Sequence, residues 1–403
     1  MSTSHIYHTQ GIKNFYYIKE EFIKDNVLIY IKRHEDKFEC SKCKSKNISK
    51  FYTRTRHIKG LKCGSKQTYF IVQVHRLKCS DCGSFAHEYL DFIPREKVHY
   101  TRAVERWVLE LRSEMSIQAI ANYLGLHWHT VKNIEKNHLE KKYKHIRLKD
   151  VEHIGIDEVY VGKKKFLTIV RDMISGAVLF IGEGKGGDAL EGFAKKLKHS
   201  KCNIKAVAVD LAPSYSAWVK KNLPTADIVY DHFHLIKLMN EKVNVIRKKT
   251  MNEIEDKLKE QLTGARALFL RNIENLNIEE KGRLDDLRIV FEDLGTVSFL
   301  KEALRKIYVI SKNEYDAELS FNYWCTLAVE SGIQQMLTMA KTIKKNIDGI
   351  IGYWRYNKLT SASMEGFNNK IGWLNRQAYG YRDKAYFKLK IFDLPNITTV
   401  KDI

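Results

Sequence analysis

Proline and long apolar stretches are scarce in this chain of 403 residues. No run of about 18 apolar residues occurs, which excludes a membrane-spanning helix. The first ten residues lack the apolar centre of a secretory signal, so we expect a cytoplasmic protein with no membrane partner. Only four prolines occur, and none lies between Thr225 and Leu394. Because proline is the strongest helix breaker, this stretch is expected to be helical.

Cysteine is too rare for a disulfide scaffold, since the chain has seven. In a reducing compartment, clustered cysteines are expected to bind metal. Four of them form two pairs, Cys40-x-x-Cys43 and Cys79-x-x-Cys82. Zn²⁺ prefers four such ligands in a tetrahedron. We predict one structural zinc at these four thiolates, with a long hairpin spanning the 35 residues between the pairs. Three further residues remain as substitute ligands: Cys63, His75 and His87.

Acidic residues are fewer than basic residues in this chain. Lys and Arg number 69 and Asp and Glu 48, which gives a net charge of +21. A balance this basic indicates a polyanionic partner, most often nucleic acid. Residues 1–150 contain 29 Lys and Arg against 16 Asp and Glu, more than half of the excess in little more than a third of the chain. We expect this N-terminal third to hold DNA phosphates.

The apolar pattern changes twice along the chain. A small β-rich unit is predicted over 35–93 and helices over 101–143, with a different pattern from residue 151 onward. There the sequence predicts three strands, a helix, a strand, a helix and another strand before the long helical stretch. This order suits a mixed α/β sheet with helices on its faces. The individual segments are strands at 69–77, 154–157, 165–172, 177–182, 205–210 and 228–231, and a helix at 189–197.

Residues 116–138 read as a helix, a short turn at Gly125 and a second helix. Small or β-branched residues at Ala121 and Val131 suit the tight crossing of a helix-turn-helix, whose second helix enters the major groove of DNA. A plain helical hairpin is the alternative. The exposed face of the second helix would offer six side chains to bases or phosphates: His127, His129, Thr130, Asn133, Lys136 and Asn137.

Asp157 and Asp210 each end an apolar strand. Strand ends of an α/β sheet are where catalytic groups gather, and two neighbouring carboxylates repel each other unless a cation joins them. Mg²⁺ or Mn²⁺ is the cation that such oxygen ligands favour. The alternative is that each Asp caps the following turn. Asp172, beside a hairpin turn, is assigned to that capping role.

Glu365 is the candidate for a third acid. In a helix it shares one face with Asn368 and Asn369, so an acid and two amides would meet a phosphodiester together. The alternative is an ordinary solvated helix. Glu330 is the nearest competitor for the role of third acid.

The motifs of this chain, in their order and spacing along the sequence, resemble those of insertion-sequence DDE transposases of the ISL3 family. The resemblance extends over nearly the whole chain. The resemblance rests on the cysteine pairs, the helix-turn-helix and six short motifs. They are Gly155-Ile-Asp157-Glu158, Asp210-Leu-Ala-Pro-Ser-Tyr215, Asp231-His-Phe-His234, Ser331-Gly332, Glu365-Gly-Phe-Asn-Asn-Lys370 and Gln377-Ala-Tyr-Gly-Tyr-Arg382.

The resemblance implies a ribonuclease-H-like catalytic domain with an all-helical insertion. Asp157, Asp210 and Glu365 would form the DDE triad, with Asp157 bridging two Mg²⁺ ions about 3.5–4 Å apart and the other two acids holding one each. His234, in a D-x-x-H motif, would contact DNA or steady the metal site, or belong to a helix-capping pair. Asn368, Asn369 and Lys370 would also contact DNA. The predicted domains are a zinc-binding domain (1–95), a helix-turn-helix domain (96–145), a catalytic domain (150–239 and 346–395) and the insertion (240–345).

Together these features predict a DNA transposase that recognises the inverted repeats at its element's ends, cleaves one strand at each and joins the 3′-OH to target DNA. We expect a homodimer, because two ends must be paired. Two alternatives share parts of the pattern. A transposase-derived regulator would bind DNA without catalysis, and a metal-dependent nuclease would cleave without strand transfer.

Overall fold

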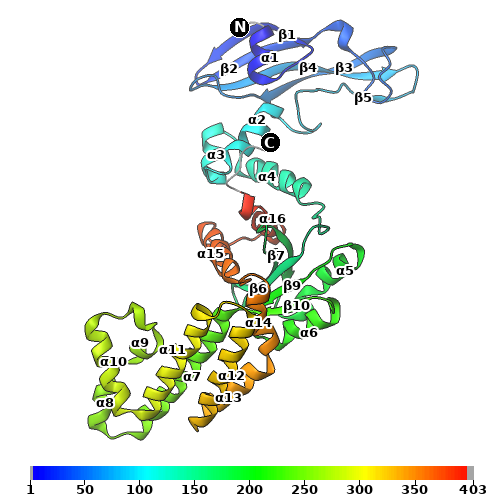
Figure 1. Cartoon of the computed structure of the whole chain (residues 1–403). Coiled ribbons are helices and arrows are strands. Elements are labelled where there is room, and N and C mark those ends of the chain that lie inside the picture. Colours follow the sequence, from blue (N-terminus) through cyan, green and yellow to red (C-terminus); the bar gives the residue numbers. More distant parts are fainter. Residues whose placement is uncertain (1–2, 397–403) are drawn as a thin grey trace. The chain divides into compact units, whose positions relative to one another are not determined.

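The computed structural model describes residues 3–396 (Figure 1). The chain forms two compact units, divided between Lys144 and His145. We call Met1–Lys144 the N-terminal unit and His145–Pro395 the C-terminal unit. Within the described residues, no helix is long and apolar enough to cross a membrane.

A five-stranded sheet forms the first part of the N-terminal unit, in the order β1-β2-β4-β3, with β5 paired to β4. The β2–β4 pair is parallel and the others are antiparallel. Ile29, Ile58 and Phe70 are buried in its core. Two strands precede the β-rich stretch expected from residue 35, so the sheet begins earlier than the pattern predicted. The elements are α1 (Thr3–Gln10), β1 (Phe15–Ile23), β2 (Asn26–Arg33), η1 (Glu35–Lys37), β3 (Ile48–Lys59), β4 (Gln67–Cys79) and β5 (Phe85–His87).

Three helices complete the N-terminal unit: α2 (Arg102–Leu111), α3 (Ile117–Leu124) and α4 (Trp128–Lys142). The predicted helix–turn–helix is confirmed. Gly125 ends α3 at a φ of 60°, where glycine carries no steric penalty. Lys59 Nζ donates to Gly125 O at 3.0 Å, and a Cβ on the glycine would lie 3.0 Å from that nitrogen. The turn therefore favours glycine for its backbone conformation, and the end of the Lys59 side chain packs closely against it.

The C-terminal unit contains a second five-stranded sheet, in the order β8-β7-β6-β9-β10. The strands β6, β7 and β8 pair antiparallel, whereas β9 and β10 run parallel to β6. The predicted mixed sheet is thus confirmed, with β6 at its centre. The strands are β6 (His153–Gly162), β7 (Lys165–Asp172), β8 (Val178–Glu183), β9 (Ala206–Val209) and β10 (Asp227–Tyr230).

Helices cover both faces of this sheet (Figure 1). Because side chains alternate along a strand, Ile156 packs with Phe193 and Trp218 on one face. Val159 packs with Phe367 on the other. The first face is covered by η2 (Gly187–Leu190), α5 (Glu191–His199) and α6 (Pro213–Asn222), and the second by α15 (Ala362–Gln377) and α16 (Lys384–Asp393), followed by η4 (Leu394–Asn396).

Helices occupy most of the chain between β10 and α15, as the scarcity of proline predicts. The last of them, α14, lies directly on β10. A Cβ at Gly349 would meet the Tyr230 ring at 2.5 Å, so glycine allows this close packing. The helices are α7 (His232–Glu253), α8 (Asp256–Leu262), α9 (Arg266–Leu270), η3 (Ile273–Asn275), α10 (Ile278–Val290), α11 (Glu292–Ile310), α12 (Glu314–Glu330), α13 (Gln334–Lys345) and α14 (Ile347–Arg355).

Candidate active site and cysteine cluster

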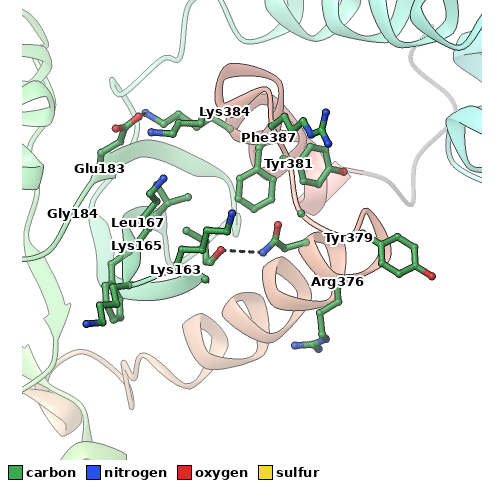
Figure 2. Close-up of a pocket in the computed structure, with 18 of the residues that line it drawn as sticks. Lys163, Lys165, Leu167, Glu183, Gly184, Arg376, Tyr379, Tyr381, Lys384 and Phe387 are labelled. Atoms are coloured by element: carbon green, nitrogen blue, oxygen red, sulfur yellow. Dashed lines mark hydrogen bonds and ion pairs between the residues drawn. The ribbon is translucent and has the colours of Figure 1, made fainter.

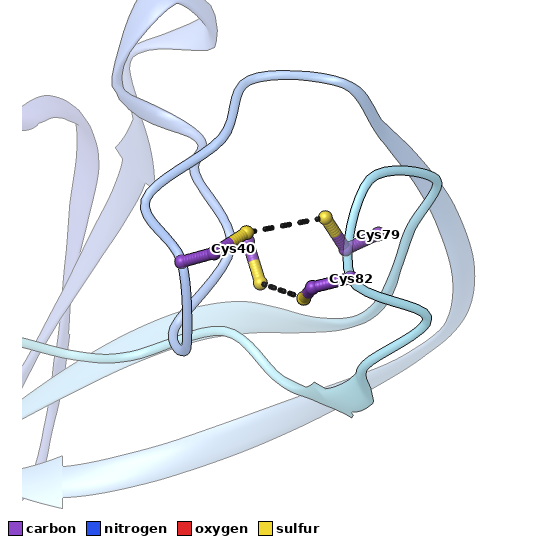
Figure 3. Close-up of side chains that lie close together, drawn as sticks. Cys40, Cys79 and Cys82 are labelled. Carbon is purple, nitrogen blue, oxygen red and sulfur yellow. Dashed lines mark hydrogen bonds between the residues drawn. The ribbon is translucent and has the colours of Figure 1, made fainter.

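The four paired cysteines converge in the N-terminal unit (Figure 3). Cys40 Sγ lies 3.6 Å from Cys82 Sγ, and Cys43 Sγ lies 3.5 Å from Cys79 Sγ. All four sulfurs lie within 4.8 Å of one another. Zn–S bonds of about 2.3 Å in a tetrahedron place sulfurs about 3.8 Å apart, so the arrangement matches a tetrahedral thiolate site.

The two cysteine pairs adopt the same turn. Lys44 N donates to Cys40 O at 3.0 Å, and Gly83 N donates to Cys79 O at 3.1 Å. Both donors have positive φ, 64° at Lys44 and 67° at Gly83. The predicted tight turn at Gly83 is therefore present. The first cysteine pair has the same turn at Lys44, where a side chain makes positive φ less favourable than it is for glycine.

The thiols resist ionising together. Backbone N–H groups of Cys43 and Lys42 lower the pKa of Cys40 to about 6. At Cys43 the Ser45 N–H lowers the pKa, but the sulfurs of Cys82, Cys79 and Cys40 raise it to about 12. A divalent cation would allow all four to be thiolates, because it compensates their mutual repulsion.

The predicted long hairpin is β3–β4, whose ends carry the two cysteine pairs. Ile48 pairs with Cys79 at its base. None of the three substitute ligands, Cys63, His75 and His87, belongs to the cluster. His75 Nδ1 bonds Thr53 Oγ1 at 2.7 Å, and Cys63 is exposed in a separate turn. Among the described residues, Cys40, Cys43, Cys79 and Cys82 form the one group of three or more potential ligands with all donor atoms within 4.8 Å.

In the C-terminal unit, Asp157 lies on β6 and Asp210 directly follows the neighbouring parallel strand β9. Asp157 Oδ2 accepts a bond from Asn368 Nδ2 of α15 at 2.8 Å. Desolvation, together with the negative charges of Asp210 and Glu158, raises the pKa of Asp157 to about 6. The backbone N–H of Glu158 and the nearby His234 act in the opposite direction. The site thus holds two interacting acids, both half-buried.

Asp210 also bonds locally, since its Oδ1 accepts from Ala212 N at 3.1 Å. It therefore makes the turn bond that the capping alternative describes. Asp172 has only the structural role predicted for it: its two oxygens accept from Ile174 N and Ser175 N at 3.1 Å each.

Glu158 lies on the opposite face of β6 from Asp157. Its Oε1 accepts from the buried Tyr215 OH at 2.6 Å and from Gly186 N at 3.2 Å, and Lys185 Nζ lies 3.5 Å from Oε2. Burial and the bond to Glu158 raise the pKa of Tyr215. This network fixes β6 against α6. The roles of Glu158 and Tyr215 were not predicted, although both lie in the quoted motifs.

Glu365 is exposed in the first turn of α15, one turn before Asn368. It does not join Asp157 and Asp210 within 4.8 Å in the described residues. Asn368 is half-buried and meets Asp157, whereas Asn369 and Lys370 are exposed. Glu365, Asn368 and Asn369 were expected to share one face of the helix. In the structure Asn368 faces the sheet, whereas Asn369 faces solvent.

The donor set around Asp157 fits a divalent cation. Carboxylate and amide oxygens are the ligands that Mg²⁺ and Mn²⁺ favour. Asn368 Oδ1 is buried and has no hydrogen-bond partner, while its Nδ2 is held by Asp157. An amide oxygen without a partner beside two acids is an unsatisfied site of the kind that a hard cation satisfies.

Asp231 joins two segments that the helices separate in sequence. It is the N-cap of α7 and accepts from Phe233 N at 3.1 Å, as the capping alternative predicted. Thr360 Oγ1 at 2.9 Å and Ser361 Oγ also donate to it, just before α15. Burial would raise its pKa, but these bonds and that of His232 lower it to about 2. Asp231 thereby fixes the start of the helix that carries Glu365 and Asn368.

Comparison with known proteins decides the family. A profile described as "Transposase" of the ISL3 DDE type matches residues 154–391, and one described as "Helix-turn-helix domain of transposase family ISL3" matches residues 95–139. The chain belongs to the ISL3 family of transposases. It is therefore a DDE-type enzyme, as the motifs predicted.

Curated relatives match along most of the chain. The transposase for insertion sequence element IS1001 of Bordetella parapertussis is 31% identical over 371 residues, covering 90% of each chain. The transposase for insertion sequence element IS1557 of Mycobacterium tuberculosis is 24% identical, covering 85% of this chain and 82% of the relative. Among solved structures, the Drosophila P element transposase strand transfer complex has a TM-score of 0.41 and 11% identity, covering 75% of this chain and 93% of that one.

The helix-turn-helix of this ISL3 transposase presents most of the predicted DNA-facing residues. His129 and Asn133 are exposed, and Thr130, Lys136 and Asn137 are half-buried. His127 is exposed but also caps α4, because its Nδ1 accepts from His129 N at 3.3 Å. The buried pair Arg112–Glu135, at 3.6 Å, holds α4 against α2. The exposed Trp128 was not predicted, because an aromatic residue at a helix start reads as core.

Proposed function

We propose that this transposase binds the inverted repeats at the ends of its own insertion sequence in the bacterial cytoplasm, cleaves one strand at each end and transfers the 3′-OH to target DNA. The observation that supports the catalytic part best is the half-buried Asp157 beside Asp210, with the pKa of Asp157 raised to about 6. Two adjacent acids kept partly out of water are an arrangement that a divalent cation and a phosphodiester would stabilise.

Asp157, Asp210 and Glu365 would hold two Mg²⁺ or Mn²⁺ ions. Bound there, the ions would lower the pKa of water or of a 3′-OH and stabilise the leaving oxygen. Asn368 keeps Asp157 oriented through its 2.8 Å bond. Glu365 is exposed on α15, and it would approach Asp157 and Asp210 when DNA and metal bind. The bonds of Asp231 to Thr360 and Ser361 limit how far α15 moves.

The reaction is two phosphoryl transfers at DNA. In the first, water attacks the phosphodiester at the element's end and the 3′ oxygen leaves as the free 3′-OH. In the second, this 3′-OH attacks a target phosphodiester and a target 3′-OH leaves. Neither step needs a covalent bond to the protein, so the acids act only on charge and position.

The N-terminal unit would supply recognition. One Zn²⁺ on Cys40, Cys43, Cys79 and Cys82 would fix the β3–β4 hairpin, and α4 would enter the major groove. Asn133 and His129 would then reach base edges, and Lys136 phosphate. His234, Asn369 and Lys370 are the proposed DNA contacts of the C-terminal unit. A homodimer would pair the two ends before joining.

Reaction products test the proposal. The purified full-length protein is incubated with Mg²⁺, a linear duplex ending in the inverted repeat, and a target plasmid. We expect end-specific nicks with 3′-OH and covalent end–plasmid joints. Binding without nicks would favour the regulator, and nicks without joints would favour the nuclease. Either result would overturn the proposed strand transfer.

A further inference from the structure

The C-terminal unit has a strongly basic groove away from the acids. A cavity of about 1400 Å³ lies between the β6–β7 turn and the segment from the end of α15 into α16. Its lining includes six lysines, two arginines and a single acid, Glu183. Figure 2 shows Lys163 and Lys165 on the strand side and Arg376, Tyr379 and Tyr381 on the helix side. Such a concentration of positive charge indicates a polyanionic ligand.

The positive charge is largely uncompensated within the protein. Glu183 pairs with Lys388 at 2.9 Å. Among the described residues, Lys163, Lys164 and Arg376 have no carboxylate within the 4.0 Å of an ion pair. A lysine whose charge is not neutralised by the fold is available to a phosphate, which is the contact that dominates nonspecific DNA binding.

The turn between β6 and β7 contains two lysines in a backbone conformation that is unfavourable for residues other than glycine. Gly162 pairs with Lys165, so Lys163 and Lys164 form a two-residue turn, and their φ values are 51° and 58°. Asn-Gly is the preferred sequence in such a turn, because both positions need positive φ. Local preference does not explain two lysines here, whereas a ligand that needs their charge does.

The groove is connected to the acids by two elements that run side by side. Asn368 Nδ2 bonds Asp157, and seven residues later Asn375 Nδ2 bonds Val161 O at 3.2 Å. β6 and α15 thus run in the same direction, from the acids toward the groove. The five residue-to-residue steps from Asp157 to Gly162 span about 17 Å of extended strand, which is about five nucleotides of a B-DNA strand.

An exposed aromatic residue favours nucleic acid over an acidic peptide. The Tyr379 side chain is fully exposed, and its backbone has a φ of 50°. Next to it, Tyr381 stacks on Phe387 with ring centroids 4.7 Å apart. Tyrosine hydroxyls are among the groups that donate hydrogen bonds to the phosphates and sugars of duplex DNA.

We propose that this groove binds the phosphate backbone of target DNA about five nucleotides from the point of joining. The inference rests on the proposed strand transfer and assigns its second DNA substrate. The proposed function assigns recognition of the transposon end to the N-terminal unit, which leaves this groove for the second DNA. A target without a fixed sequence must be held near the acids by contacts that do not read bases, and lysines and arginines provide them.

The variant Lys163→Asn/Lys164→Gly tests the groove without disturbing the turn, because it removes two charges and installs the preferred turn sequence. The control is Lys220→Ala/Lys221→Ala, which removes two exposed lysines from α6 of the same unit. Both proteins are assayed at full length for nicking of an uncleaved end and for joining of a pre-cleaved end to a plasmid.

We expect the groove variant to join about tenfold less than wild type at physiological salt, with nicking unchanged and the control like wild type. Equal joining by the groove variant and wild type would overturn the proposal. An equal loss of nicking would also overturn it, because the groove would then hold the transposon end.

Binding of the full-length protein to a duplex without inverted repeats tests the groove even if no catalysis is observed. Two lost phosphate contacts should reduce the slope of log affinity against log salt by about 1.8. The advantage of wild type over the variant should then shrink about tenfold between 50 and 200 mM salt. An unchanged slope would contradict the groove. Absence of nicks and joints in wild type, beside this slope change, would contradict only the proposed function.

Discussion

The two candidate metal sites of this transposase are assembled in different ways. The four cysteines meet within 4.8 Å of one another, and they come from the two ends of one hairpin. The acids come from β6, the end of β9 and α15, and Glu365 stays apart from the other two. Neighbouring carboxylates repel each other and favour water. The cysteine site therefore needs only one hairpin to form, whereas the acidic site needs three separate elements, and we expect it to close around cations and DNA.

The largest effect should come from removing charge at the acids. Asp157→Asn, Asp210→Asn and Glu365→Gln keep side-chain size but remove one negative charge each. We expect each to lower the cleavage rate by at least about 10²–10³-fold while end binding persists, measured with a labelled end duplex. Glu330→Gln on α12 is the matched control and should cleave normally. An active Glu365→Gln protein beside an inactive Glu330→Gln protein would reassign the third acid.

Loss of the cysteine cluster should unfold part of the N-terminal unit and abolish its DNA binding. Metal analysis of the full-length protein should give about one zinc per chain. Cys79→Ser should lose the zinc and unfold the β3–β4 hairpin, because the metal-binding free energy contributes to folding. End binding should be lost, and the far-ultraviolet signal of the helical C-terminal unit should remain. Cys63→Ser, an exposed cysteine outside the cluster, should retain zinc. A zinc-free protein that still binds ends would refute the structural role.

The burial of Asp157 should make stability depend on pH. Its folded pKa of about 6 exceeds its ordinary value of 3.8, so the folded state binds the extra proton between about pH 4 and 6. Without divalent metal, stability should therefore fall as the pH rises through this window. Asp157→Asn should be about 1–3 kcal/mol more stable than wild type at pH 7, and similar near pH 4, in urea titrations.

Divalent metal should remove the stability advantage of Asp157→Asn over wild type at pH 7. Mg²⁺ or Mn²⁺ should stabilise wild type at pH 7 and leave Asp157→Asn unchanged, because only the wild type gains a ligand for the cation. Asp172→Asn is the control, since that acid bonds only its own turn. It should lose stability and keep the response to metal. Equal metal responses of wild type and Asp157→Asn would exclude Asp157 as a ligand.

Smaller effects should separate the two kinds of DNA contact in the N-terminal unit. Lys136→Ala should weaken binding to all duplexes and lower the salt slope by about 1, because it removes a phosphate contact. Asn133→Ala should reduce the preference for end duplex over random duplex by about 1–3 kcal/mol, because it removes a base contact. Fluorescence anisotropy with both duplexes measures the two quantities. Equal affinity of wild type for end and random duplex would contradict sequence recognition.

Much of the N-terminal unit could be predicted because its signals are local. The cysteine pairs recur at the spacing of a metal-binding turn, and Gly125 marks the end of α3. The first strand was missed because the solvent-facing β1 has weak alternation: Phe15 is buried, and the rest of the strand is exposed or half-buried. The second strand, β2, alternates regularly, so its signal was present in the sequence. The pairing of β1 with β2 was decided by the hairpin and by the parallel contact of β2 with β4.

The sequence by itself determined the family, the cysteine set and the three candidate acids, because each is carried by residues close together in the chain or by motifs in a fixed order. Only the tertiary structure decided which groups meet. Asn368 bonds Asp157 across 211 residues, and Ser361 and Thr360 bond Asp231 across the intervening helices. The basic groove likewise joins the β6–β7 turn to α16. Such contacts depend on how helices pack on the two faces of a sheet, which periodicity and spacing along the chain do not specify.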